Sequence, residues 1–196
     1  MKDFIEILKK CSLFSQIGEN DLQRMLHCLG ARIVAFDKKY TVFAEGSPAK
    51  HIGILLSGAV QMVQTDYYGN RSILINVAPG EVFAEAFACA ETEACPVAVV
   101  ANDESAVMLL DARHVLHTCA NSCGFHQQLI FNLMKDLAIK TTLFHQKIEI
   151  ISNVAKRIGI QSADDLYNTL GYGGLAVSKI AGKLRDEFER LIKPEP

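Results

Sequence analysis

The sequence predicts an α+β fold: an N-terminal β-roll of the jelly-roll (double-stranded β-helix) kind, a long helix, and a small helical segment at the C-terminus. Three observations carry this prediction. Short β-rich runs alternate with turn signals between Arg32 and Asp111, a heptad pattern runs on from Phe125, and a glycine-containing turn separates two helical stretches after Ile160. Strands this short, with no helices between them, are typical of a sandwich or roll.

The composition is that of an ordinary globular protein. The 196 residues are 49% hydrophobic and 21% charged, which excludes wholesale disorder. The formal net charge of -2 excludes a uniformly basic protein that coats polyanions, although a local basic patch remains open. Charges interrupt every apolar stretch well short of the ~20 residues that a membrane span needs, and the first residues lack the apolar core of a signal peptide. We expect a soluble, cytoplasmic protein without a membrane partner.

The first domain is predicted to begin with a helical stretch and to continue as a roll. Residues 8–29 carry apolar side chains at helical spacing, and Gly30 ends the stretch as a helix C-cap. Six β-rich runs follow, over residues 32–36, 52–56, 60–65, 72–77, 97–100 and 105–110. Residues 66–70 are predicted to form the tip of a hairpin between two of these strands. We assign residues 1–124 to this domain.

Residues 125–152 are predicted to form one long helix with an apolar seam. Two sets of residues recur every seven positions, offset by four, with no Gly or Pro among them. They are Ile130, Met134, Leu137, Thr141, Phe144, Ile148 and Ile151. A helix of this length spans ~42 Å at 1.5 Å per residue, which is more than a small roll covers. We therefore expect a homodimer through this helix; the alternative is a helix that packs only on its own domain.

Residues 153–196 are predicted to form a helix-turn-helix. Two short helical segments flank the turn at residues 171–174, which is the arrangement of that motif, although many helical pairs that do not bind DNA share it. Seven Lys and Arg side chains stand against six Asp and Glu in this part of the chain. A net charge of +1 gives only a weak electrostatic attraction to the phosphates of a nucleic-acid partner.

In this order the parts resemble the Crp/Fnr family of bacterial transcription regulators. Residues 43–46 and 52–60 resemble the family's "F-x-E-G … I-L-x-G-x-V" strands, and residues 79–85 resemble its phosphate-binding cassette, "P-G-E-x-F-G-E". Residues 165–171, followed by residues 177–179, resemble its helix-turn-helix. The resemblance implies a cyclic-nucleotide-binding-like sensor domain, a homodimer, a duplex DNA partner and no enzymatic activity. The chain also contains no P-loop, HExxH or GxSxG motif that would indicate an enzyme.

The cassette departs from the family pattern where a cyclic phosphate would bind. The resemblance implies a ligand pocket formed by Gly80, Glu81, Phe83, Glu85, Cys95, Pro96 and Val97. In members that bind cyclic AMP, an Arg neutralises the phosphate, but here Cys95 falls at that position and Pro96 lacks an N–H donor. A buried phosphate without a partner costs several kcal/mol. We therefore expect a different, unknown small-molecule effector.

Cysteines offer a second kind of sensor. Cys119, Cys123 and His126 are spaced to lie on one helical face, and thiolate and imidazole groups suit zinc, iron or a redox pair. This is only part of a tetrahedral site, so a metal would need ligands from elsewhere in the chain or from a second subunit. The alternative is that the six cysteines, among which there is no CxxC pair, are small buried hydrophobes.

The helix-turn-helix departs from the family pattern as well. Gly174 and Leu175 stand where the family's recognition helix carries an Arg and a Glu that reach base edges. Ser178, Lys179 and Lys183 remain as candidate DNA contacts, and contacts to phosphates position a protein without reading sequence. The family's β-hairpin wing is also not recognisable. We expect weak DNA binding of low specificity; the alternative is a regulator-derived protein that binds a ligand or heterodimerises and no longer binds DNA specifically.

Overall fold

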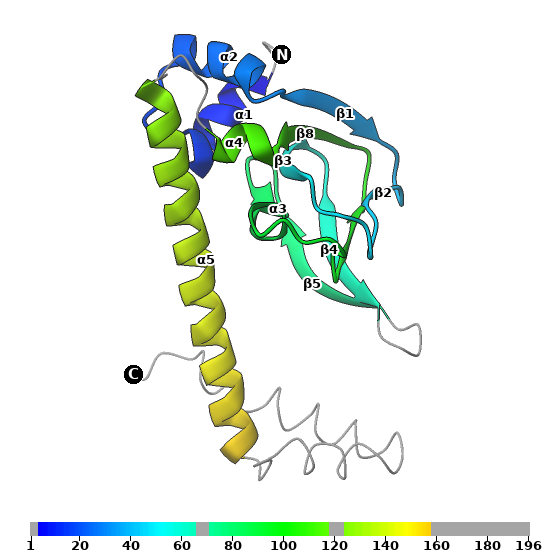
Figure 1. The fold of residues 1–196 in the computed structure, drawn as a ribbon. Helices are drawn as coiled ribbons and strands as arrows, with labels where there is room; N and C mark the ends of the chain where they lie inside the picture. The colour runs from blue at the N-terminus through cyan, green and yellow to red at the C-terminus, as the bar shows by residue number, and fades with distance from the viewer. Residues whose placement is uncertain (1–3, 66–70, 118–123, 158–196) are drawn as a thin grey trace, which may run out of the picture. The chain divides into compact units, whose positions relative to one another are not determined.

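A computed structural model describes residues 4–65, 71–117 and 124–157 (Figure 1). The chain divides into two compact units, Met1–Ala138 and Ile139–Pro196, and each is considered by itself. Several predictions lie outside the described residues: the hairpin tip at 66–70, Cys119 and Cys123, and the helix-turn-helix. No helix in the described part of the chain has both the length and the apolar character to cross a membrane.

The N-terminal helical stretch is broken into three short helices. They are α1 (Ile5–Lys10), the 3-10 helix η2 (Ser12–Phe14) and α2 (Glu19–Cys28). The prediction of one continuous helix was wrong, because the backbone of Cys11 is extended and that of Gln16 is left-handed, at φ 64°. These bends let Leu13 and Phe14 enter the same apolar core as the helices on either side. Gly30, at φ 61°, ends α2 as predicted.

The described strands form two four-stranded antiparallel sheets, ordered β1-β8-β3-β6 and β2-β7-β4-β5. Their bounds are β1 (Arg32–Phe36), β2 (Thr41–Phe43), β3 (His51–Ser57), β4 (Val60–Thr65), β5 (Arg71–Val77), β6 (Val82–Phe83), β7 (Ala98–Ala101) and β8 (Ser105–Asp111). The six predicted runs correspond to β1, β3, β4, β5, β7 and β8, which confirms the predicted roll. The sequence missed β2 and β6, because strands of three and two residues are too short to show an alternating pattern.

Strand β3 separates two apolar cores. Ile52, Ile54 and Leu56 pack into a core shared with the helices, whereas Leu55 packs into a second core inside the roll. Strand β8 divides its side chains in the same way, since successive residues of a strand point to opposite faces. Both faces of these strands are therefore covered by apolar side chains.

Helix α5 (Gly124–Arg157) follows the roll and the short helix α4 (Ala112–Leu116). Within the first unit, Leu129 and Leu133 are buried in the helical core, and the Asn132 side-chain amide donates to the carbonyls of Leu13 and Ser15, at 3.0 and 2.7 Å. The first compact unit thus continues into α5 as far as Ala138. The division at residues 124 and 125 stays a prediction.

Asp111 caps α4 and binds the first turn of that helix. Its carboxylate accepts hydrogen bonds from the Arg113 backbone N–H at 2.9 Å and from the Arg113 guanidinium, with Nη2 at 3.0 Å. The guanidinium bond is the main cause that lowers the pKa of Asp111 from 3.8 to about 2. Because the pKa is lower in the folded protein, ionised Asp111 contributes its full stabilisation when the pH is above the pKa of the unfolded chain, 3.8. This stabilisation is lost as the pH falls towards the folded pKa of about 2.

We expect Asp111→Ala to lower the free energy of unfolding by about 1 kcal/mol, because it removes a helix cap. Asp111→Asn should cost less, since an amide oxygen also caps a helix, and the Arg113 ion pair that it loses is largely exposed. Urea unfolding of the three proteins checks this. The difference between wild type and Asp111→Asn should shrink as the pH is lowered through the range between 3.8 and about 2. A difference that does not change with pH would contradict the role of the charge.

Candidate ligand site in the roll

A loop tied to β3 holds the cassette. Gly80, at φ 90°, donates its N–H to the Leu55 carbonyl at 2.7 Å, and the Leu55 N–H donates to the Glu81 carbonyl at 3.1 Å. Ala84 is the N-cap of α3 (Glu85–Cys89) and has a left-handed backbone, at φ 61°. It stands where the family pattern has glycine, and such a backbone costs an L-residue roughly 1–2 kcal/mol. Ala84 therefore adopts a backbone conformation that glycine accommodates without strain.

The two predicted carboxylates have different surroundings. Glu81 is exposed, and its Oε2 accepts the Ala78 N–H at 2.8 Å, so this side chain closes its own turn. Glu85 is buried in the first turn of α3. Cys89 follows one helical turn later, where burial and then the charge of Glu85 raise the pKa of its thiol. The Cys89 thiol is therefore favoured in its neutral form.

The segment at Cys95 is held by backbone hydrogen bonds. The Cys95 N–H donates to the Ser47 carbonyl at 3.0 Å, and its own carbonyl accepts the Gly46 N–H at 2.8 Å. The side chain is only 5% exposed and packs in the inner core of the roll. Between Asn70 and Asp111 the sequence contains one basic residue, Arg71. Cys95, at the position where the resemblance places the cassette Arg, is thus a buried thiol with only one basic residue in its segment, and its equivalence to that Arg stays a prediction.

Aromatic side chains form the rest of the site. Phe83 lies 5.9 Å from Phe43 between ring centroids and packs over Gly53, where a Cβ atom would overlap its ring. Phe83, Cys95 and Val97 belong to one buried cluster, against which Phe87 is partly packed. The structure thus brings together three of the predicted pocket residues, whereas Pro96 is exposed. The roles of Phe43 and Gly53 were missed, although a glycine inside a strand indicates a close approach.

The predicted metal or redox group can be assessed at one residue. His126 is buried near the start of α5, and its Nε2 donates a hydrogen bond to the Val115 carbonyl at 2.9 Å. Only Nδ1 would then remain to bind a metal. Across residues 4–65, 71–117 and 124–157, no three His, Cys, Asp or Glu side chains converge as metal ligands would. With Cys119 and Cys123 outside this range, the site stays a prediction.

Comparison with known proteins identifies the fold. Residues 33–122 match the family model described as the cyclic nucleotide-binding domain. Among solved structures, the chain is similar to the sensor domain of the transcriptional regulator DNR from Pseudomonas aeruginosa, with 22% identity and a TM-score of 0.58 over 76% of this chain and 93% of that one. None of the curated proteins that were compared matches the chain.

Two further structures extend this similarity. One is a cyclic nucleotide-binding domain from Methylobacillus flagellatus KT, with 16% identity and a TM-score of 0.62 over 75% of this chain and 81% of that one. The other is the Thermus thermophilus catabolite activator protein, with 16% identity and a TM-score of 0.61 over 94% of this chain and 91% of that one. The roll therefore has the cyclic nucleotide-binding fold.

Proposed function

We propose that this protein is a dimeric, cytoplasmic, non-enzymatic transcription regulator of the Crp/Fnr type, whose roll responds to a ligand or redox state other than cyclic AMP. One observation supports the proposal most strongly: the same chain contains a cyclic nucleotide-binding roll and a long helix with exposed apolar side chains. The similarity to the Thermus catabolite activator protein, which extends over nearly the whole of both chains, supports the same arrangement of parts.

The effector is proposed to be an uncharged or apolar small molecule. The inner core presents Phe43, Phe83 and Val97, and a buried thiol takes the place of the phosphate-binding guanidinium. A cyclic phosphate placed there would lose its hydration without gaining a cationic partner.

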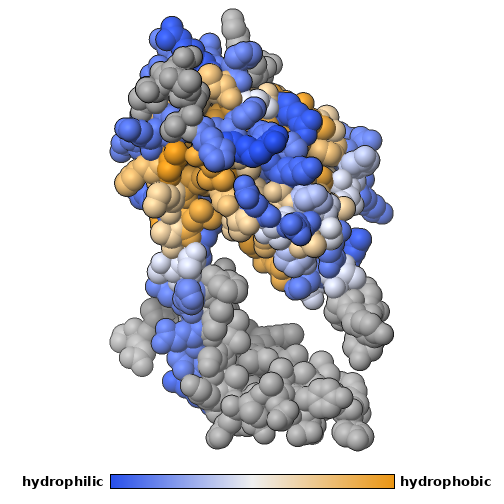
Figure 2. All heavy atoms as spheres, viewed as in Figure 1, coloured by the Kyte–Doolittle hydropathy of each residue, from blue (hydrophilic) through white to orange (hydrophobic). Residues whose placement is uncertain are grey.

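The dimer is proposed to form through α5. Apolar side chains gather over the upper half of this helix in Figure 2. Met134 and Phe131 are 64% and 61% exposed on the face turned away from buried Leu129. Leu137, by contrast, is partly packed against the helical core of its own domain. Near the roll, the surface offered to a second chain is therefore centred on Met134 and extends to Phe131, a residue outside the predicted heptad seam.

DNA binding is proposed to be weak and of low specificity, with Ser178, Lys179 and Lys183 contacting phosphates. These residues lie outside the described part of the chain, and the proposal rests on the Gly174 and Leu175 positions, which lack the expected Arg and Glu. Each bidentate base contact supplies ~1–3 kcal/mol of discrimination, so losing two from each half-site removes most of the specificity.

Titration of the protein against its own upstream region and against a scrambled duplex, at two salt concentrations, tests this proposal. We expect similar affinities for both duplexes, and a log–log salt slope of about 0.9 for each phosphate neutralised. A preference of about a thousandfold for the native sequence, which is the low end for specific DNA readers, would show that sequence reading survives. Complete absence of binding at low salt would instead favour the second candidate, a ligand-binding or heterodimerising protein derived from a regulator.

A further inference from the structure

Side-chain hydrogen bonds tie the first turns of α5 to the short helix η2 within the first compact unit. The Asn132 amide donates to the Leu13 and Ser15 carbonyls at 3.0 and 2.7 Å. One turn further along α5, the Asp136 Oδ1 accepts the hydroxyl of Ser12 at 3.0 Å. We call the side chains of Asn132, Asp136 and Ser12 the polar latch.

Asn132 is the most constrained member of the polar latch, because it is buried. Only 5% of this residue is exposed, and Gln128 donates to its carbonyl oxygen at 2.9 Å, so both ends of the amide are engaged. The Leu13 and Ser15 carbonyls lie at the end of η2, where a helix leaves its last carbonyls without partners of its own. A rotation of α5 about its axis would separate these donors and acceptors, and a buried polar group without a partner is costly.

The apolar contacts of α5 do not fix this rotation in the same way. Leu129 and Leu133 pack in the helical core, and the gain from burying apolar surface has no preferred direction. A hydrogen bond is directional, because it weakens steeply when the donor and the acceptor are no longer aligned. The polar latch therefore selects one rotational setting of α5 among those that would bury the same leucines.

The polar latch and the exposed apolar side chains lie on opposite faces of α5. At 3.6 residues per turn, Asn132 and Asp136 each lie about 160° around the helix axis from Met134. Met134 and Phe131 are 64% and 61% exposed. The setting that the polar latch selects is thus the one that turns Met134 and Phe131 outward.

We propose that Asn132 and Asp136 are positioning residues for dimerisation: through the polar latch they fix which face of α5 is offered to a second copy of this chain. This inference rests on the proposed dimer through α5. In coiled coils, a single buried Asn in the seam lowers stability and selects one register. Here the polar residues lie behind the seam and act on it through the rotation of the helix.

Oxidative cross-linking of single-cysteine additions to the full-length protein tests the proposal. With the latch intact, Met134→Cys should form the intermolecular disulfide in at least about five times the yield of Lys135→Cys, because Lys135 lies about 100° further around the helix and disulfides require close Cα atoms. Asn132→Leu keeps the size of the side chain and cannot form the bonds, so it should bring the two yields within about twofold of each other. The wild type, treated with the same oxidant, gives the background from native thiols such as exposed Cys28.

Two control variants separate orientation from stability. Leu133→Ala removes a buried side chain beside the latch and lowers the stability of the unit, but it should keep the difference in yield. Asp136→Asn should keep it as well, since an amide oxygen also accepts the Ser12 hydroxyl. Thermal unfolding verifies that each variant is folded. If Asn132→Leu does not fold, Asp136→Leu takes its place with the same expected result, because its partner Ser12 is exposed.

Three outcomes would overturn the proposal. Retention of the yield difference in Asn132→Leu, in a protein that light scattering shows to be a dimer, would remove the positioning role and leave the proposed dimer standing. Loss of the difference in Leu133→Ala as well would show that any loss of stability releases the helix. A wild-type mass of one chain would instead refute the proposed dimer, and the positioning role with it, so the two failures are distinguishable.

Discussion

Gly58→Ala is expected to lower the free energy of unfolding by about 3 kcal/mol, the upper part of the range for a single substitution. Gly58 joins β3 to β4, and hence one sheet to the other, at φ 85°, where an L-residue is strained. A Cβ atom there would overlap the Glu104 carbonyl oxygen and Ser105. The Ser105 hydroxyl is buried, accepts the Ala59 N–H at 3.2 Å and donates to the Asp103 carbonyl at 2.7 Å. Moving Ser105 aside would therefore break buried hydrogen bonds, which adds to the cost.

Gly46→Ala is the matched control. Gly46 has a similar backbone, at φ 77°, but its Cβ would meet no atom within 4 Å. Its substitution should cost about 1 kcal/mol, from backbone strain alone. Urea unfolding gives the free energy of unfolding of both variants, and the difference between them is the cost of the overlap of the new Cβ atom with Glu104 and Ser105. Equal losses for Gly58→Ala and Gly46→Ala would show that Ser105 and Glu104 do not constrain the turn.

Met134→Glu is expected to convert the protein from a dimer to a monomer. In a dimer through α5, the two Met134 side chains would lie close to the symmetry axis, so the substitution brings two like charges together in an apolar seam. The side chain is 64% exposed within one chain, so the fold of the monomer does not depend on it. Light scattering at micromolar concentration should give the mass of two chains for the wild type and of one chain for the variant.

Two further variants sharpen this experiment. Gln146→Glu introduces the same single charge at an exposed position away from the seam, and it should leave the dimer intact. Leu137→Glu should also dissociate the dimer, but it will lower the stability of the monomer too, because Leu137 packs against the helical core. A wild-type mass of one chain would contradict the dimer, whatever the variants show.

The elements that sequence patterns predicted are those whose signal is local. Strands β3 and β8 show as apolar runs bounded by turns, and α5 shows as an unbroken heptad pattern. The bend between α1 and α2 was missed because Leu13 and Phe14 keep helical spacing while the backbone turns at Cys11 and Gln16. In that segment, the gain from burying both side chains outweighs the lost helical hydrogen bonds.

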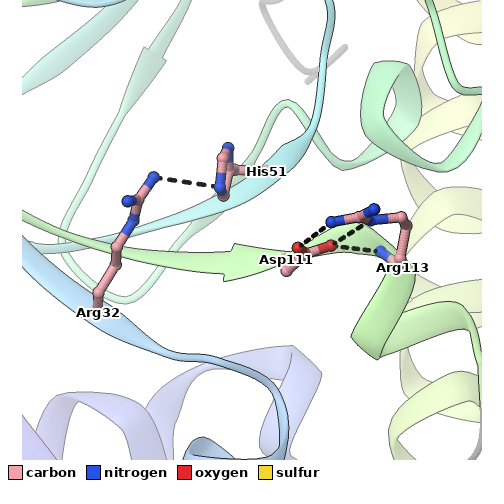
Figure 3. Close-up of polar contacts among 4 residues, drawn as sticks. All are labelled: Arg32, His51, Asp111 and Arg113. Atoms are coloured by element: carbon pink, nitrogen blue, oxygen red, sulfur yellow. Dashed lines mark hydrogen bonds and ion pairs between the residues drawn. The ribbon is translucent and has the colours of Figure 1, made fainter.

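The candidate site was predictable in composition but not in geometry. The position of Cys95 in the chain indicated the missing cation, whereas its burial and its backbone bonds to Gly46 and Ser47 depend on contacts between distant strands. Glu81, whose place beside a ligand stays a prediction, accepts a hydrogen bond from the N–H of Ala78, three residues earlier, which the composition did not indicate. The hydrogen bond between Arg32 and His51 (Figure 3) could not be predicted from the sequence, because only the register of β1, β8 and β3 brings the two side chains together.

Isothermal titration of the purified protein with cyclic AMP tests the central claim most directly. A cyclic nucleotide-binding domain that carries the cassette Arg, titrated in the same buffer, is the positive control. With a buried Cys95 at the position where the resemblance places the phosphate-binding Arg, we expect no heat of binding at concentrations that saturate the control. A dissociation constant in the low micromolar range, which corresponds to about -8 kcal/mol, would show that another cation reaches the phosphate and would contradict this account of the sensor.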